Sequence, residues 1–262
     1  MSSSTRPLHV TGSTSARRML AERGGLAVAA GFYLIVVSAV SALWRAAAAA
    51  NGGHVAGYGA AALTWYLATS EAAIVALNVR LIEEIGDDIA SGAIAVELLR
   101  PASVLAVRVA AEVGRSLPRL AVCVGAGSLL AWLLVGPPPD GTALLLAGPA
   151  LVLAIVCNLL AQHAFAAAAF WIRDARSTWF LYQKLVFMLG GMLLPLEVLP
   201  GRLHTVAAAL PFSAMAYAPA RLASGHVEPA LLVEQAAWLV VLAGAAVAAF
   251  NAGEKRLQVL GG

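Results

Sequence analysis

Six mainly apolar stretches follow one another along the chain and dominate its hydropathy pattern. A helix needs roughly 20 such residues to cross about 30 Å of hydrocarbon. The stretches therefore predict an all-α membrane protein, with one domain of six transmembrane helices over residues 24–253. The predicted spans are residues 24–44, 55–79, 120–136, 141–172, 184–197 and 234–253. The fifth is the shortest uncharged run and spans only if Lys184 reaches one interface and Glu197 lies at the other.

Polar segments flank these spans and indicate their orientation. Residues 1–23 are rich in Ser, Thr and Arg and predict a loose cytoplasmic tail, and residues 254–262 form the other tail. With the N-terminus inside, fourteen Lys and Arg residues fall in cytoplasmic segments, against Arg45, Arg202 and Arg221 outside. The positive-inside rule then predicts that both termini are cytoplasmic. A cleaved signal peptide is the alternative for the first span, but its apolar stretch is too long.

The predicted first cytoplasmic loop, residues 80–119, carries two helical patterns. In the first, apolar residues recur every three or four positions and acidic residues occupy the other side, with a possible break at Ser91–Gly92. The second places Arg108, Glu112, Arg115 and Arg119 on one side, which is typical of a helix along the membrane interface with its charges in water. Both can be ordinary loop structure on lipid. Alternatively the first is a docking element, because about forty residues exceed what a connector needs.

A second unusual segment, residues 200–228, lies on the predicted external side. It is moderately apolar and contains Pro200, Pro211 and Pro219. Because non-spanning backbone at membrane depth must be satisfied by protein or water, a re-entrant helix pair or an interfacial helix is expected here.

Three polar residues fall inside predicted spans. Glu71 would cost about 2.5 kcal/mol or more in hydrocarbon, so it is expected to face the bundle interior or a cavity, or to be protonated. It can serve transport or form a structural hydrogen bond. Asn158 and His163 can line a pathway or join helices by hydrogen bonds, and the second role is the commoner one.

Composition supports the membrane interpretation. The chain of 262 residues is 61% hydrophobic and only 12% charged, about half the charge of a soluble domain. The two cysteines lie in apolar stretches, and neither they nor any other pattern predicts a metal or a cofactor. The sequence also lacks the phosphate-binding G-x-x-x-x-G-K-[ST] loop, so any ATP-driven work would need another subunit.

Three segments together resemble one family. The segments IGDDIASGAIAVELLRP, FWIRDARSTWFLYQKLVFMLGGMLLPLEVLPGRL and LPFSAMAYAPARL begin at Ile85, Phe170 and Leu210. In order and spacing they are similar to the type-2 permease subunits of ATP-binding cassette (ABC) exporters. The resemblance covers nearly the whole chain, but it says little about which substrate is carried.

This resemblance implies a permease in the bacterial cytoplasmic membrane that exports a small amphiphilic, drug-like compound. It pairs with a second permease, identical or similar, and with cytoplasmic ATPase subunits that bind ATP and Mg²⁺. The chain itself would not be an enzyme. The residues implied at the ATPase contact, the coupling helix, are Ile85, Asp87, Asp88, Ile89, Gly92 and Arg100. The alternatives are a gradient-driven transporter that uses Glu71 and His163, and a non-transporting scaffold or assembly factor.

Overall fold

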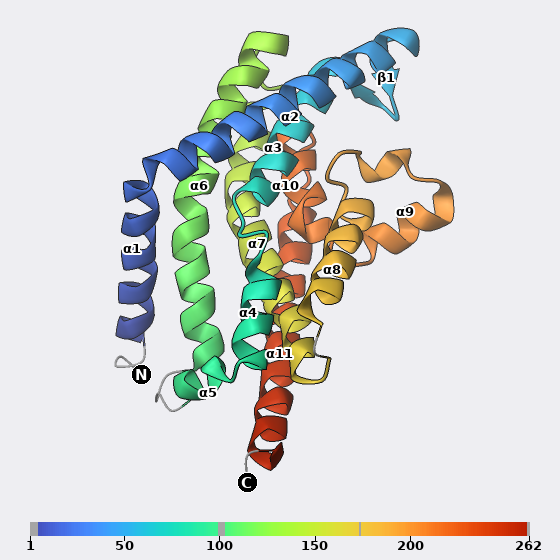
Figure 1. The fold of residues 1–262 in the computed structure, drawn as a ribbon. Coiled ribbons are helices and arrows are strands. Elements are labelled where there is room, and N and C mark those ends of the chain that lie inside the picture. Colours follow the sequence, from blue (N-terminus) through green and yellow to red (C-terminus); the bar gives the residue numbers. More distant parts are fainter. Residues whose placement is uncertain (1–4, 99–102, 173, 261–262) are drawn as a thin grey trace.

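The computed structural model describes residues 5–98, 103–172 and 174–260 and shows a bundle of helices (Figure 1). Strands β1 (His54–Val55) and β2 (Tyr58–Gly59) form a small antiparallel hairpin. The helices are α1 (Thr5–Ala21), α2 (Arg23–Ala50), α3 (Ala60–Val75), α4 (Leu81–Ala90), α5 (Ala93–Leu98), α6 (Val104–Val135), α7 (Gly141–Ala166), η1 (Ala167–Phe170), α8 (Ala175–Leu189), η2 (Leu196–Val198), α9 (Gly201–Ala208), η3 (Ser213–Met215), α10 (Tyr217–Ala223) and α11 (Ala230–Leu260).

Four segments of the described chain are long and apolar enough to cross a membrane. They are Gly24–Ala50, Val104–Val135, Gly141–Phe170 and Ala230–Arg256. Helices α3 and α8 have 16 and 15 residues, so each rises about 24 Å or less at 1.5 Å per residue. That is short of the 30 Å hydrocarbon core. The predicted all-α membrane protein is confirmed, whereas a count of six spans stays a prediction.

Helix α6 is continuous, and this corrects the prediction of a separate interfacial helix before the third span. Its 32 residues rise about 48 Å, roughly 18 Å more than the hydrocarbon core. The segment from Arg108 to Arg119 has about this surplus length, so one helix holds both the charged segment and the span. Pro118 lies inside α6 and has no N–H to bond the carbonyl oxygen of Gly114.

The N-terminal segment is helical rather than loose. Helix α1 packs along one half of α6 (Figure 1). A Cβ atom on Gly114 would lie 2.1 Å from the carbonyl oxygen of Gly12, and one on Gly12 would lie 3.2 Å from that of Ala110. Only glycine permits this approach of the two backbones. Residues 5–21 therefore belong to the folded body.

Helix α7 is the centre of the bundle, and it packs against α4, α6, α8, α10 and α11. Small residues allow these close contacts: Ala147, Ala150 and Ala154 are 2% exposed or less. Behind α7, a Cβ atom on Gly253 of α11 would lie 2.0 Å from the Phe170 ring. The helices around α7 therefore approach it closely through small residues.

Residues 200–228, predicted as a re-entrant or interfacial segment, form the short helices α9 and α10 with η3 between them. Helix α10 is largely buried against α3 and α7, whereas α9 is mostly exposed. The prediction allowed either a re-entrant helix pair or an interfacial helix, and which of these the segment forms in the membrane stays a prediction.

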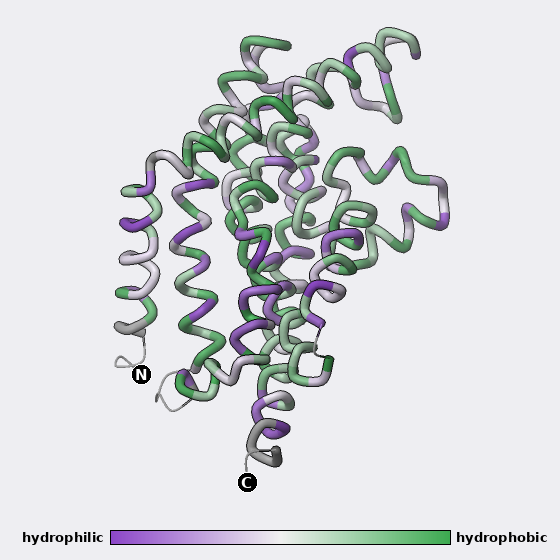
Figure 2. The backbone as a smooth tube through the Cα atoms, viewed as in Figure 1, coloured by the Kyte–Doolittle hydropathy of each residue, from purple (hydrophilic) through white to green (hydrophobic). Residues whose placement is uncertain are grey.

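The bundle has one hydrophilic end. Hydrophilic residues gather around α4 and the adjacent halves of α6 and α11, whereas α2 and the far half of α6 are mainly hydrophobic (Figure 2). The start of α1, helix α5 and the end of α11 also lie at this end (Figure 1).

Candidate functional site

A cavity of about 370 Å³ lies between the end of α3, α7 and α8. One part of its lining is apolar, and the other carries amide, hydroxyl and ammonium groups. The apolar residues are Ile74, Leu77, Val79, Val186, Phe187 and Met192. The polar and aromatic residues are Asn158, Gln162, Trp179, Tyr182, Gln183 and Lys184. A lining of this kind suits a small amphiphilic ligand.

Asn158 is the central hydrogen-bond acceptor among the polar residues of the cavity. Its Oδ1 atom accepts hydrogen bonds from Gln162 Nε2 at 2.8 Å and from Tyr182 Oη at 2.7 Å. All three residues are 6% exposed or less, so these bonds satisfy buried polar groups and join α8 to α7. The sequence pointed to Asn158 but not to Tyr182, because an aromatic residue at helical spacing gives no sign of what its hydroxyl contacts.

Glu71 and His163 lie inside the protein but do not line this cavity. Glu71 is 4% exposed, so it faces protein rather than lipid, as expected. Glu71 Oε1 has no hydrogen bond to any described residue, so the structural hydrogen bond considered for this residue is not seen at that atom. His163 is fully buried, with Nδ1 2.7 Å from the Leu159 carbonyl oxygen and its ring 6.3 Å from that of Phe250. Their roles in transport stay predictions.

The first-loop pattern folds as two short helices, α4 and α5, that separate at Ser91–Gly92. Gly92 has a φ angle of 76°, a left-handed conformation that glycine adopts without strain. The predicted break is therefore confirmed at the predicted residues.

The apolar side of α4 is buried within the chain itself. Ile82 and Ile85 are fully buried and Ile89 is 5% exposed, and α4 packs against α7, η1 and α8. A Cβ atom on Gly86 would lie 2.2 Å from Ala175 Cβ, so α4 and α8 touch here. The bundle covers the side of α4 that Ile85 and Ile89 occupy, so neither residue offers a free surface in this structure. Their contact with an ATPase stays a prediction.

The opposite side of these helices is open. We define the α4–α5 tip by its exposed residues, which are Asp87, Ala90, Ser91, Gly92, Ala93, Ala95 and Val96. Asp87 and Gly92 of the predicted contact therefore lie on an accessible surface, and Val96 is 65% exposed. Arg100 lies outside the described residues.

Asp88 is partly exposed and forms part of an ion-pair cluster. Arg108 of α6 donates from Nη2 to Asp88 Oδ2 at 2.6 Å, and from Nε to Glu97 Oε2 at 2.8 Å. The Arg108 side chain is only 17% exposed. One guanidinium thus ties α4 and α5 to α6, an arrangement that we call the Arg108 clamp. Because 41% of the Asp88 side chain stays exposed, the predicted contact of Asp88 with the ATPase stays a prediction.

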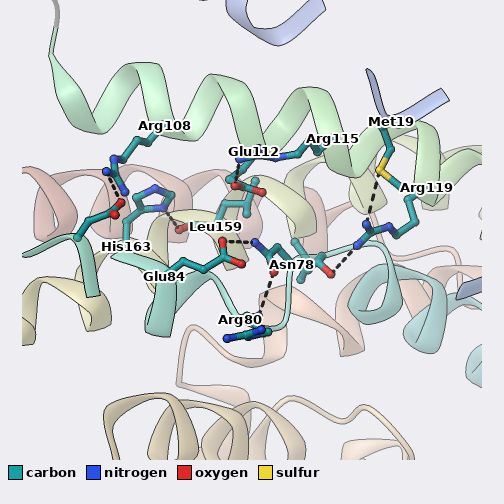
Figure 3. Close-up of polar contacts among 12 residues, drawn as sticks. Met19, Asn78, Arg80, Glu84, Arg108, Glu112, Arg115, Arg119, Leu159 and His163 are labelled. Carbon is teal, nitrogen blue, oxygen red and sulfur yellow. Dashed lines mark hydrogen bonds and ion pairs between the residues drawn. The ribbon is translucent and has the colours of Figure 1, made fainter. Parts of the chain in front are cut away.

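The rest of the charged side of α6 is partly covered by protein (Figure 3). Glu112 is 2% exposed and pairs with Arg115, whose side chain is 49% exposed. Arg119 donates from Nη1 to the Leu77 carbonyl oxygen at 3.1 Å. The prediction that this side lies in water is therefore corrected for Glu112, which is buried, but not for Arg115.

A second ion cluster, away from α4 and α5, centres on Arg221 of α10. Arg221 pairs with Glu197 and, at 2.7 Å, with Glu228. Tyr217 Oη donates to Glu197 Oε1 at 2.7 Å. The Arg221 guanidinium holds the pKa of the Glu228 carboxyl below its usual range. The cluster fastens η2 and the residues before α11 to α10, and no sequence pattern indicated it because its members are far apart.

Comparison with known proteins agrees with this architecture. A search of curated proteins found no match. The family model described as "ABC-2 family transporter protein" matches residues 33–261, a range that runs from α2 to beyond α11 and includes the cavity, the α4–α5 tip and both ion clusters. Since the match covers most of the chain, the protein belongs to the ABC-2 transporter family.

Proposed function

We propose that the chain is the permease subunit of an ABC exporter that moves a small amphiphilic compound out across the bacterial cytoplasmic membrane. One observation carries the proposal. The buried side of α4 contacts α7 and α8, the two helices that line most of the cavity. A partner that moves the accessible α4–α5 tip would therefore move the cavity walls. That partner is a separate ATPase subunit, which binds ATP and Mg²⁺, and this chain catalyses no reaction.

The full transporter would pair this chain with a second permease, identical or similar. We place six spans in each permease, with α3 and α8 completing their crossings through the non-helical residues that follow them. Both termini would be cytoplasmic. The hydrophilic end, which holds the start of α1 and the end of α11 together with α5, supports this orientation (Figures 1 and 2).

The orientation can be tested by labelling single introduced cysteines with an impermeant thiol reagent in intact cells. Gly141 and Ser177 are exposed at the starts of α7 and α8, whereas the native Cys123 and Cys157 are fully buried and give little background. We expect Gly141→Cys to react from outside and Ser177→Cys to react only after the cells are opened. The opposite pattern would overturn the proposed sidedness.

The ATPase contact can be tested on the complex purified in mild detergent. We expect an ABC ATPase to co-purify and its ATP hydrolysis to rise with an amphiphilic substrate. Asp87→Lys combined with Val96→Glu should lower the ATPase yield roughly tenfold, because an exposed apolar residue at an interface centre contributes more than a rim charge. The matched control is Val206→Glu on α9, where Val206 is 51% exposed. Equal yields from both variants would place the contact elsewhere, and the absence of any ATPase would favour a scaffold.

A gradient-driven transporter is the second candidate. It is favoured by two buried atoms that have no hydrogen-bond partner among the described residues, Glu71 Oε1 and His163 Nε2. Groups of this kind can carry protons through a membrane protein. Uptake by purified chain in liposomes, driven by a proton gradient without ATPase and lost in Glu71→Gln, would replace the ABC proposal with this one.

A further inference from the structure

We propose that the cavity between α7 and α8 binds an amphiphile that carries one anionic group, with Lys184 as the counter-ion. This deepens the proposed function and rests on its placement of α8 within the membrane. It assigns a charge to the substrate, which neither the family nor the overall hydropathy does.

Lys184 is an exposed residue that stands ten residues beyond Asp174, the N-cap of α8, which is about 15 Å along the axis. The sequence pattern placed Lys184 at an interface, whereas the proposed crossing begins with α8 and would place it deep within a 30 Å core. A lysine at that depth costs about 2.5–3.5 kcal/mol unless a partner stabilises it. Its ammonium lies 5.1 Å from the centre of the Phe180 ring, and no carboxylate of the described chain lies within ion-pair distance.

The cavity around Lys184 offers donors and no negative charge. No Asp or Glu is among the residues that line it. Asn158 Oδ1 accepts two hydrogen bonds, whereas Asn158 Nδ2 donates to no other described residue and stays available as a donor. The side-chain amide of Gln183 adds a second donor beside Lys184. An ammonium with nearby amide donors is suited to a carboxylate, sulfate or phosphate.

The apolar part of the lining accounts for the rest of the ligand. The apolar residues of the cavity, among them Ile74, Val186 and Met192, would bury a hydrocarbon chain. A volume of about 370 Å³ is at the small end of ligand pockets. It fits a single-chain molecule better than a two-chain phospholipid, so we assign the site to a free single-chain amphiphile.

Trp179, which also lines the cavity, provides the readout. The full chain, purified in a maltoside detergent without ATPase, is titrated with a brominated fatty acid that quenches tryptophan fluorescence on contact. The difference between wild type and Trp179→Phe isolates the signal of this residue. We expect saturable quenching by the carboxylate and none by a brominated alkyl-trimethylammonium of the same length.

Lys184→Gln should raise the apparent Kd for the fatty acid about tenfold, and Lys184→Arg should keep it within about threefold. Lys255→Gln, at an exposed position on α11, is the matched control and should bind as wild type. Thermal unfolding of each variant checks that it is folded. Equal affinity in Lys184→Gln, or equal quenching by the cation, would overturn the proposal.

A second arm distinguishes the source of the anion. If a brominated phospholipid in nanodiscs quenches Trp179 and outcompetes the fatty acid, the occupant is a membrane lipid, and the assignment to a free amphiphile is wrong. Because no ATPase is present, these results stand apart from the co-purification test. If the fatty acid binds but no ATPase co-purifies, the binding site stands and the ABC proposal fails. If an ATPase co-purifies but the fatty acid does not bind, the permease proposal stands and the binding site fails.

Discussion

Replacing Arg108 by Ala is expected to lower substrate transport about tenfold while the ATPase subunit still co-purifies. The substitution removes the three hydrogen bonds of the Arg108 clamp and leaves Asp88 and Glu97 without the cation that joins them to α6. Charge-assisted hydrogen bonds contribute roughly 1.5–3 kcal/mol each, and exposure of the carboxylates reduces that value here. A net loss of about 1.4 kcal/mol corresponds to a tenfold effect.

The reason for a transport defect, rather than a binding defect, is the position of the clamp. The ATPase is proposed to bind the exposed α4–α5 tip, whereas Arg108 lies on the inner side of these helices, with 17% of its side chain exposed. Without the clamp, α5 can move without moving α6. ATP hydrolysis should then continue while transport falls, which is the signature of uncoupling.

The measurement is the ratio of transported substrate to ATP hydrolysed in proteoliposomes. Arg108→Lys serves as a graded control, because an ammonium can keep one ion pair but not the two-sided geometry of a guanidinium. Arg202→Ala on the exposed α9 controls for the loss of an arginine elsewhere. Wild-type coupling in Arg108→Ala would remove the clamp from the mechanism.

The double variant Ile85→Ala, Ile89→Ala is expected to destabilise the whole protein rather than to uncouple it. Both side chains lie in the main hydrophobic core, where each truncation to Ala costs about 2–5 kcal/mol through lost burial and the cavity left behind. Two such losses approach the total stability of many domains, about 5–15 kcal/mol. Little of this variant should reach the membrane as folded protein.

Fluorescence-detected gel filtration after heating measures this effect directly. Val96→Ala is the matched control, because Val96 is 65% exposed on the same pair of helices and its truncation leaves no cavity. We expect wild-type thermal stability for the control and a large loss for the double variant. If the double variant is as stable as wild type yet loses its ATPase, the two isoleucines do face a partner, as their pattern first indicated.

Periodicity predicted the α4 helix well but could not identify what covers it. The isoleucines at steps of three and four define one apolar side. The break between α4 and α5 at Ser91–Gly92 follows from the left-handed backbone conformation that glycine adopts without strain. An apolar side is buried equally well by a partner or by the same chain, and the sequence does not distinguish the two. In this structure the chain itself covers the apolar side of α4. Gly86 lies close to Ala175, a residue about ninety positions away in the sequence.

The charged side of α6 shows the same limit for polar residues. Charges at helical spacing normally face water, and on that basis a surface helix was the simplest prediction. Here Asp88 and Glu97 lie opposite Arg108, so the chain provides its own counter-ions. The cavity was equally hidden, because Asn158, Tyr182 and Lys184 become neighbours only when α8 packs on α7.

The proline inside α6 marks the point at which this long helix can bend. Pro118 weakens the backbone hydrogen bonding one turn after Gly114. Helix α1 contacts α6 on both sides of this proline, since Gly12 lies against Gly114 and Arg119 donates to Met19 Sδ. The part of α6 beyond Pro118 runs 17 residues to Val135, about 26 Å. A bend of about 5° at the proline would displace the end of α6 by about 2 Å over this length. The position of a single proline therefore sets how far a bend would displace the end of the helix.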